Sequence, residues 1–145
     1  MSRVWTIGYE RLLPGPLVAE LEAAGVRRVI DVRFRPQSRR PGMSKTRLGA
    51  MLAEHGIDYE HRRALGTPAD LRALYRAGRV AEAAAAYRTH VETTAASELD
   101  ALAAELDGGP TTALLCLEAD PAQCHRSVIV ASLRARRPGL RVVNL

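Results

Sequence analysis

The 145-residue chain is poor in cysteine, in aromatic side chains and in long apolar runs. Its two cysteines are too few for the disulfide framework of a secreted protein, so we expect reduced thiols and a cytoplasmic location. No apolar run approaches the roughly 20 residues of a membrane helix. The N-terminal segment lacks the long apolar core of a signal peptide, and we expect no membrane partner. One phenylalanine and one tryptophan are too few for an aromatic platform that stacks on single-stranded nucleic acid.

Standard phosphate-binding signatures are also missing. The chain has neither a Walker loop nor a Gly-x-Gly-x-x-Gly turn, so nothing supports ordinary ATP or dinucleotide binding. The familiar phosphatase arrangement places an arginine six positions after a cysteine. Here Val130 stands at that distance from Cys124, and Ala122 stands at that distance from Cys116.

Lysine is nearly absent, because Lys45 is the single lysine beside twenty arginines, and the net charge is +5. The excess gathers in two segments. Residues 27–47 hold eight basic residues and one acid, and residues 126–145 hold five arginines and no acid. Residues 48–125 are acidic, with six basic and twelve acidic residues. The basic segments favour an anionic partner, although arginine together with 24 alanines is also what a GC-rich genome produces.

Short apolar runs alternate with helical periodicity along the chain, a pattern typical of an α/β fold. Apolar or β-rich runs predict strands over residues 4–7, 28–33, 57–61, 111–117 and 140–143. Helical spacing predicts helices over residues 17–24, 44–55 and 121–136, with two or three more between residues 69 and 107. We expect a single three-layer domain over residues 1–145, with a mostly parallel sheet of about five strands and helices on both faces, Rossmann-like or flavodoxin-like.

Three segments follow the carboxyl ends of predicted strands: residues 6–9, 31–39 and 116–126. In an open α/β sheet, ligands bind beyond these ends. The three segments also hold most of the reactive side chains of the chain. We therefore expect them to converge on one cleft.

Four separated motifs carry a resemblance to a known family. They are Thr6-Ile7-Gly8-Tyr9; Asp31-Val32-Arg33 with Pro36 and Ser38-Arg39; Gly56-Ile57-Asp58-Tyr59 with His61 and Leu65-Gly66; and Leu115-Cys116-Leu117-Glu118 with Cys124-His125-Arg126. In this order they resemble domain-of-unknown-function family 488 (DUF488), small and mainly bacterial cytosolic proteins. Members often carry a histidine where this chain has Tyr9 and a second glycine where it has Thr67. The resemblance indicates where the site lies and names no reaction.

The tripeptide Cys124-His125-Arg126 is the most specific candidate for chemistry. If the helix begins at Pro121, free backbone N–H groups and the helix dipole favour an anion nearby. The same field, with His125 and Arg126 adjacent, would lower the pKa of the thiol. Cys124 is therefore a candidate nucleophile and Arg126 a candidate anion ligand. An inert core thiol is the alternative for Cys124, and it is the interpretation that we favour for Cys116.

Two carboxylates are candidates for acid–base work. Glu118 could act as a general base or could hold an arginine such as Arg33 or Arg126. Asp31 and Arg33 project to the same side of their strand, so they could pair with each other or face a ligand.

Further candidate ligand-binding residues come from the strand ends and from the basic loop over residues 33–47: Gly8, Tyr9, Arg33, Ser38, Arg39, Tyr59, His61, Cys116 and Arg126. Arginine forks suit phosphate or carboxylate. For Arg40 and Arg47 we favour a solvated loop without a ligand.

Metal ligation is chemically open to Cys116, Glu118, Cys124 and His125, but their spacing matches no standard finger or ribbon. We predict no cofactor.

The leading hypothesis is one cleft for an anionic, phosphate-bearing ligand, a nucleotide or a nucleic acid, with Cys124 performing any chemistry. The alternatives are a non-catalytic nucleic-acid-binding module and a metal- or thiol-dependent enzyme for a small metabolite. A homodimer is plausible for so small a fold, without a seam that the sequence identifies.

Overall fold

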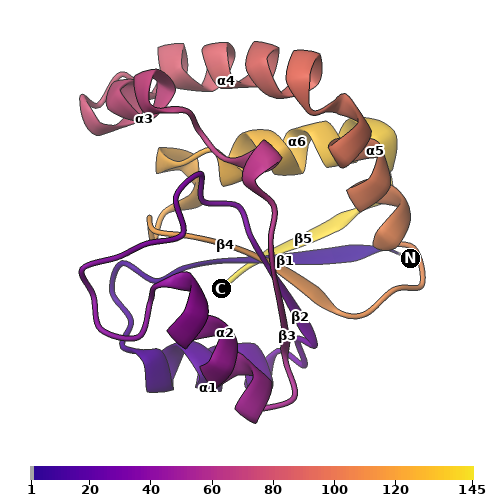
Figure 1. Ribbon diagram of the computed structural model, residues 1–145. Helices are drawn as coiled ribbons and strands as arrows, with labels where there is room; N and C mark the ends of the chain where they lie inside the picture. Colours follow the sequence, from indigo (N-terminus) through magenta and orange to yellow (C-terminus); the bar gives the residue numbers. More distant parts are fainter. Residues whose placement is uncertain (1) are drawn as a thin grey trace.

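The computed structural model describes residues 2–145 and is built on one five-stranded parallel sheet (Figure 1). Its strands are β1 (Arg3–Gly8), β2 (Arg28–Asp31), β3 (Asp58–His61), β4 (Thr112–Cys116) and β5 (Arg141–Asn144). They pair in the order β3-β2-β4-β1-β5, and every pairing is parallel. The central strand β4 is buried along its whole length, as a continuous apolar run predicts for a strand covered on both faces.

Helices cover both faces of the sheet, which confirms the three-layer α/β fold (Figure 1). One face carries α1 (Pro14–Ala23) and α2 (Lys45–Glu54). The other face carries α3 (Ala69–Arg76), α4 (Val80–Thr94), α5 (Ala96–Glu105) and α6 (Arg126–Arg136). Short 3-10 helices over Arg63–Leu65 and Pro121–Gln123 lie in the connections. None of the helices in residues 2–145 has the length and apolar character that a membrane crossing requires.

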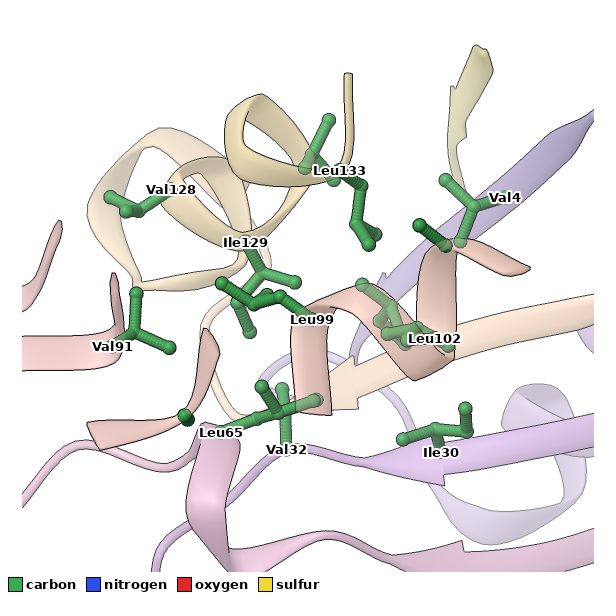
Figure 2. Close-up of a cluster of buried hydrophobic side chains, with 14 of the residues drawn as sticks. Val4, Ile30, Val32, Leu65, Val91, Leu99, Leu102, Val128, Ile129 and Leu133 are labelled. Atoms are coloured by element: carbon green, nitrogen blue, oxygen red, sulfur yellow. The ribbon is translucent and has the colours of Figure 1, made fainter. Parts of the chain in front are cut away.

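Two hydrophobic clusters form the core, one on each face of the sheet. Ile30 of β2 belongs to the cluster under α4, α5 and α6, whereas its neighbour Val29 belongs to the cluster over α1 and α2. This alternation is the two-residue period of a strand. Figure 2 shows the first cluster, in which Leu99 and Leu102 of α5 and Ile129 of α6 lie among the apolar side chains of the sheet.

The chain leaves β1 and β4 in opposite directions. From β1 it passes through α1 and crosses β4 to reach β2, and from β4 it passes through α6 and crosses β1 to reach β5. The carboxyl ends of β1 and β4 therefore form a topological switch point, the place where open α/β sheets bind ligands.

The helix expected from Pro121 begins later. Residues Pro121–Gln123 form a single 3-10 turn, in which the Asp120 side chain accepts a hydrogen bond from the N–H of Ala122. Cys124 then takes an extended conformation, and α6 starts only at Arg126. Asp120 and Pro121 do begin a helical turn, as their residue types predict. The turn does not continue into α6, because the extended conformation of Cys124 interrupts the series of helical hydrogen bonds.

The helix cap expected at Ser44 is also wrong. Ser44 stands immediately before α2, but its side chain makes no capping hydrogen bond. Its hydroxyl instead accepts a bond from the N–H of Ser38 and donates one to the Ser38 carbonyl. The serine thus closes the loop that precedes the helix.

Candidate functional site

A pocket opens at the switch point, with a cavity volume of about 130 Å³. Side chains from all three segments that follow the strands line it: Tyr9, Arg33, Gln37, Cys116, Glu118, Cys124 and His125. These segments are remote in sequence, and the parallel sheet brings them to one edge. The expected convergence on one cleft is therefore what the fold produces.

Gly8 is required by a close approach between β1 and the chain that follows β4. A Cβ atom at this position would lie 1.7 Å from the carbonyl oxygen of Glu118. The contact continues beyond it, because the N–H of Tyr9 donates to the Cys116 carbonyl at 3.2 Å. Gly8 does not line the pocket. Its absent side chain lets β1 hold the segment that carries Cys116 and Glu118.

The two cysteines of the chain meet in this pocket. Their Sγ atoms are 2.7 Å apart, although Cys116 ends β4 and Cys124 precedes α6. Both are free thiols, with 1% and 2% of their surface exposed, and both line the cavity. The Cys116 thiol also donates to Glu118 Oε2 at 3.5 Å, and the N–H of Arg126 donates to Cys124 Sγ at 3.3 Å.

The environment divides the two thiols electrostatically. Burial disfavours a thiolate at Cys124, but hydrogen bonds with Cys116 and His125 and the charges of His125 and Arg126 outweigh it and set the pKa of Cys124 well below its usual range. Burial acts first on Cys116 and, with the neighbouring Cys124 charge, raises the pKa of Cys116 well above its usual range. These opposite shifts favour ionisation of Cys124 over Cys116.

His125 is fixed beside the thiolate as the first residue before α6. Its Nε2 lies 2.7 Å from the carbonyl oxygen of Val32 and donates to it, and its ring meets the Tyr87 ring edge-on with centroids 5.2 Å apart. Burial opposes a charged imidazole, but the hydrogen bond and charge of Cys124 raise the pKa of His125. The imidazolium and the thiolate support each other.

Glu118 supplies a carboxyl group at the same place. Burial first, and then the charge of Cys124, raise the pKa of Glu118 above that of an ordinary glutamate. A carboxyl group with a raised pKa can give up a proton near neutral pH. The alternative in which the Glu118 carboxylate holds Arg126 is not what the structure shows, because Arg126 Nη2 donates to the Glu118 backbone carbonyl at 2.6 Å.

Asp31 and Arg33 form a buried ion pair that supports the wall of the pocket. Arg33 Nη2 lies 2.7 Å from Asp31 Oδ2, and the Tyr59 hydroxyl donates to the same oxygen at 2.5 Å. The other end of the guanidinium donates to the Met43 carbonyl at 2.7 Å and to the Tyr9 hydroxyl at 3.2 Å. These bonds tie the basic loop to β2. Arg33 borders the cavity, whereas Asp31 and Tyr59 do not.

The other sequence candidates lie outside the pocket. Ser38 and Arg39 line a shallow groove along the basic loop. His61 lines a second groove, between that loop and Arg63, and its Nε2 donates to the Arg33 carbonyl at 2.7 Å. Arg126 lines a third groove beside β5, apart from the cavity that holds Cys124. The three arginines 33, 39 and 126 thus do not surround one anion.

Helix α3 supplies residues that sequence reasoning missed. Arg72, Tyr75 and Arg76 line the pocket opposite the thiols' own segments. The Tyr75 hydroxyl is buried and has no hydrogen-bond partner within residues 2–145, and burial together with the nearby Cys124 and Glu118 charges raises its pKa to about 12. The spacing of three and four residues places all of them on one helical face. That spacing was the available signal, in a region interpreted as helical surface.

The loops that shape the rim depend on Gly66. A Cβ atom there would lie 2.4 Å from the Cα of Phe34, so the two segments touch through their backbones. The contact sets Phe34, Arg35 and Thr67 at the mouth of the cavity. The motif around Leu65 therefore shapes the site without supplying a reactive group.

A metal could be held by three of the expected ligands. The Sγ atoms of Cys116 and Cys124 and a carboxylate oxygen of Glu118 lie within 4.8 Å of one another. Two sulfurs and one carboxylate form a donor set suited to zinc or iron. His125 is not in this group, because neither of its ring nitrogens lies within that distance of all three atoms.

Comparison with known proteins places the chain in a family. A family model described as Domain of unknown function DUF488 matches residues 16–133. No curated protein and no solved structure gives a significant match. The match covers most of the chain and confirms the resemblance that the four motifs carry, and the protein therefore belongs to the DUF488 family.

Proposed function

We propose that the protein is a thiol-dependent enzyme that binds a small anionic ligand, a phosphate ester or a similar oxyanion, and acts on it through Cys124. One observation carries this proposal. The Cys124 sulfur lines the cavity and accepts a hydrogen bond from the Arg126 N–H at 3.3 Å, next to His125, whose pKa is raised, and these are conditions that activate a cysteine nucleophile.

Arginines at the rim supply the recognition of the anion. Arg35, Arg72 and Arg76 line the pocket, and no ion pair in the described part of the chain engages them. Their guanidinium groups are thus available for a bidentate bond to phosphate or carboxylate. The unpartnered hydroxyl of Tyr75 offers one more donor inside the cavity.

The size of the cavity limits the ligand. About 130 Å³ suits an oxyanion with a small body and is too little for an enclosed nucleotide. A larger ligand would extend into the adjoining groove, where Phe34, Lys45, His61 and Arg63 lie. The groove shares Phe34, Arg35 and Gln37 with the pocket, so the two are continuous.

The chemical step assigns one role to each group. The Cys124 thiolate gives its electron pair to an electrophilic centre of the ligand, and the bond to the leaving group breaks. Glu118 passes its proton to the leaving group. Water or another acceptor then removes the group from sulfur and returns a proton to Glu118. His125 stabilises the Cys124 thiolate before the attack and again when the group leaves the sulfur.

Alkylation of Cys124 with two reagents of different charge tests the proposal. Positive potential from Arg72 and Arg76 should speed iodoacetate relative to neutral iodoacetamide by about tenfold, and Arg72→Ala with Arg76→Ala should remove this preference. Inorganic phosphate should protect the wild-type thiol. Arg88→Ala, on the exposed surface of α4, is the matched control and should change neither rate.

The competing outcome is equally clear. If the arginine variants leave the ratio of the two alkylation rates unchanged and phosphate gives no protection, the pocket does not select anions. If iodoacetamide reacts with Cys124 no faster than with free cysteine at neutral pH, Cys124 is an inert core thiol. Either result would overturn the proposal.

A second candidate function, a nucleic-acid-binding module, rests on a different surface. The groove along residues 36–47 is lined by Arg39, Arg40, Lys45 and Arg47. Arg40 is partly committed, since its Nη1 donates to the Tyr9 carbonyl at 2.6 Å. Titration of labelled oligonucleotides at several salt concentrations tests this function, because phosphate contacts give steep salt dependence. Arg39→Ala should weaken such binding, and unchanged binding would reject the groove.

A further inference from the structure

The second thiol of the pocket forms no bond to the ligand in the nucleophilic step just described. Cys116 Sγ nevertheless lies 2.7 Å from Cys124 Sγ and donates a hydrogen bond to Glu118 at 3.5 Å. The chain has two cysteines, and the fold brings both to one point from the end of β4 and from the extended residue before α6.

We propose that Cys124 and Cys116 form a peroxide-reactive pair, in which Cys124 is oxidised by a small hydroperoxide and Cys116 resolves the product as a Cys116–Cys124 disulfide. The inference rests on the Cys124 nucleophile of the proposed function and on the contact between the two sulfurs inside the cavity, and it adds a second class of substrate. It does not depend on the rim arginines.

The burial of the pair selects the oxidant. Cys116 and Cys124 are 1% and 2% exposed, and the cavity that reaches them measures about 130 Å³. A protein disulfide cannot enter this space, whereas hydrogen peroxide or a short alkyl hydroperoxide can. A small thiol can follow the same route to reduce the disulfide, which makes the change reversible.

The first step oxidises Cys124. The thiolate attacks one peroxide oxygen, the S–O bond forms and the O–O bond breaks. The departing oxygen takes the proton of the Glu118 carboxyl group and leaves as water or as an alcohol. Cys124 is then a sulfenic acid, and Glu118 is a carboxylate within hydrogen-bond distance of the Cys116 thiol.

The second step joins the sulfurs. Glu118 accepts the Cys116 proton along the existing hydrogen bond, and the Cys116 thiolate attacks the Cys124 sulfur. The S–S bond forms, the S–O bond breaks, and the hydroxide recovers the proton from Glu118 as water. Two thiols and one hydrogen peroxide thus yield one disulfide and two waters.

Little movement is needed for this closure. The two sulfurs are already in contact, so the bond can form without moving the elements that carry them. Neither cysteine lies inside a helix, since Cys116 ends β4 and Cys124 has extended dihedral angles of φ −144° and ψ 167°.

Hydrogen peroxide added in equimolar amount to the full chain tests the pair. Intact-mass measurement should show the loss of two hydrogens, and peptide mapping should find the Cys116–Cys124 cross-link, which dithiothreitol removes. Free cysteine is only a few per cent thiolate at neutral pH, so the reaction should run about tenfold faster than with free cysteine. Cys124→Ser should abolish the fast phase.

The variant Cys116→Ser separates the two steps. It should still consume one equivalent of peroxide but stop at a Cys124 sulfenic acid that a cyclic 1,3-dione captures. A wild-type protein that accumulates the captured sulfenic acid without a cross-link, or that forms disulfides between molecules, would overturn the inference. If the serine variant does not fold, the wild-type cross-link still decides.

Failure of this inference is distinct from failure of the proposed function. Anion-steered alkylation of Cys124 without any disulfide would remove the peroxide reaction alone. Disulfide formation without any effect of Arg72 or Arg76 on alkylation would remove the anionic ligand alone.

Discussion

His125 Nε2 donates a 2.7 Å hydrogen bond to the carbonyl oxygen of Val32, and this bond joins the segment before α6 to the end of β2. The carbonyl can only accept, so the ring must carry a proton on Nε2. Cys124 in turn affects the protonation of this ring. Its charge raises the pKa of His125 despite burial. One backbone contact thus orients the group that sustains the thiolate.

Replacement of this histidine should change the pH profile of the thiol. The lowered pKa of Cys124 keeps the thiolate present as pH falls, so its rate of reaction with iodoacetamide should stay flat through neutral pH and drop only in acid. His125→Gln removes the stabilising charge and should move the drop to higher pH. A shift of one pKa unit would slow alkylation about tenfold at acidic pH.

His55→Gln is the matched control for that experiment. His55 lies at the exposed end of α2, paired with Glu22 at 3.5 Å and away from the pocket. Its replacement should leave the profile unchanged. Identical profiles for the His125 variant and the wild type would show that His125 does not sustain the thiolate.

The buried ion pair should dominate the stability of the pocket wall. Asp31→Asn leaves the buried guanidinium of Arg33 without its counter-charge, and we expect a loss of about 3–5 kcal/mol in the free energy of unfolding. Glu82→Gln breaks the exposed pair with Arg79 and should cost less than about 1 kcal/mol. Urea denaturation measures both, and equal small losses would mean that the pair does not support the fold.

Gly8 and Gly15 offer a contrast between a crowded and an open glycine. Gly8→Ala drives a Cβ into the Glu118 carbonyl and should destabilise the protein by about 1–3 kcal/mol while slowing alkylation of Cys124. Gly15→Ala, in α1 with no atom within 4 Å of the new Cβ, should be neutral or stabilise by up to about 1 kcal/mol. Thermal unfolding distinguishes them, and a harmless Gly8→Ala would contradict the contact.

Replacement of Tyr75 by phenylalanine should stabilise the fold and weaken ligand binding. Its buried hydroxyl lacks a partner in residues 2–145, so Tyr75→Phe should raise the free energy of unfolding by about 1 kcal/mol and weaken the protection of Cys124 by phosphate. Tyr87→Phe loses a hydrogen bond to the Leu65 carbonyl and should destabilise by about the same amount. Unfolding curves and protection assays report both effects. A Tyr75 variant with unaltered protection would exclude its hydroxyl from ligand binding.

Much of the fold follows from local pattern. The apolar run of β4 predicts a strand buried on both faces, and the regular alternation of strands and helices predicts a parallel sheet. The convergence of residues 6–9, 31–39 and 116–126 follows from the same topology, because parallel strands end at one edge. The predicted start of α6 at Pro121 was wrong, because Asp120 and Pro121 specify a single turn. Whether the helix continues beyond that turn depends on the residues that pack around it.

The arginines show what local sequence pattern cannot predict, namely which charged side chains line the pocket. Arg33 and Arg72 look alike in sequence, but Arg33 is held by Asp31, whereas Arg72 reaches the pocket from a helix that sequence reasoning treated as surface. A charged side chain acquires its role from the partner beside it, and partners are brought together by the tertiary fold.

The sequence by itself determined the family, the α/β sheet and the edge at which reactive groups gather, because these depend on the order of motifs and on hydrophobic period. Its shortage of cysteine first excluded a disulfide framework. Only the tertiary structure placed Cys116 beside Cys124, since seven intervening residues set no distance until β4 and α6 pack on the same core. The opposite shifts in the pKa values of the two scarce thiols are therefore a consequence of packing and burial.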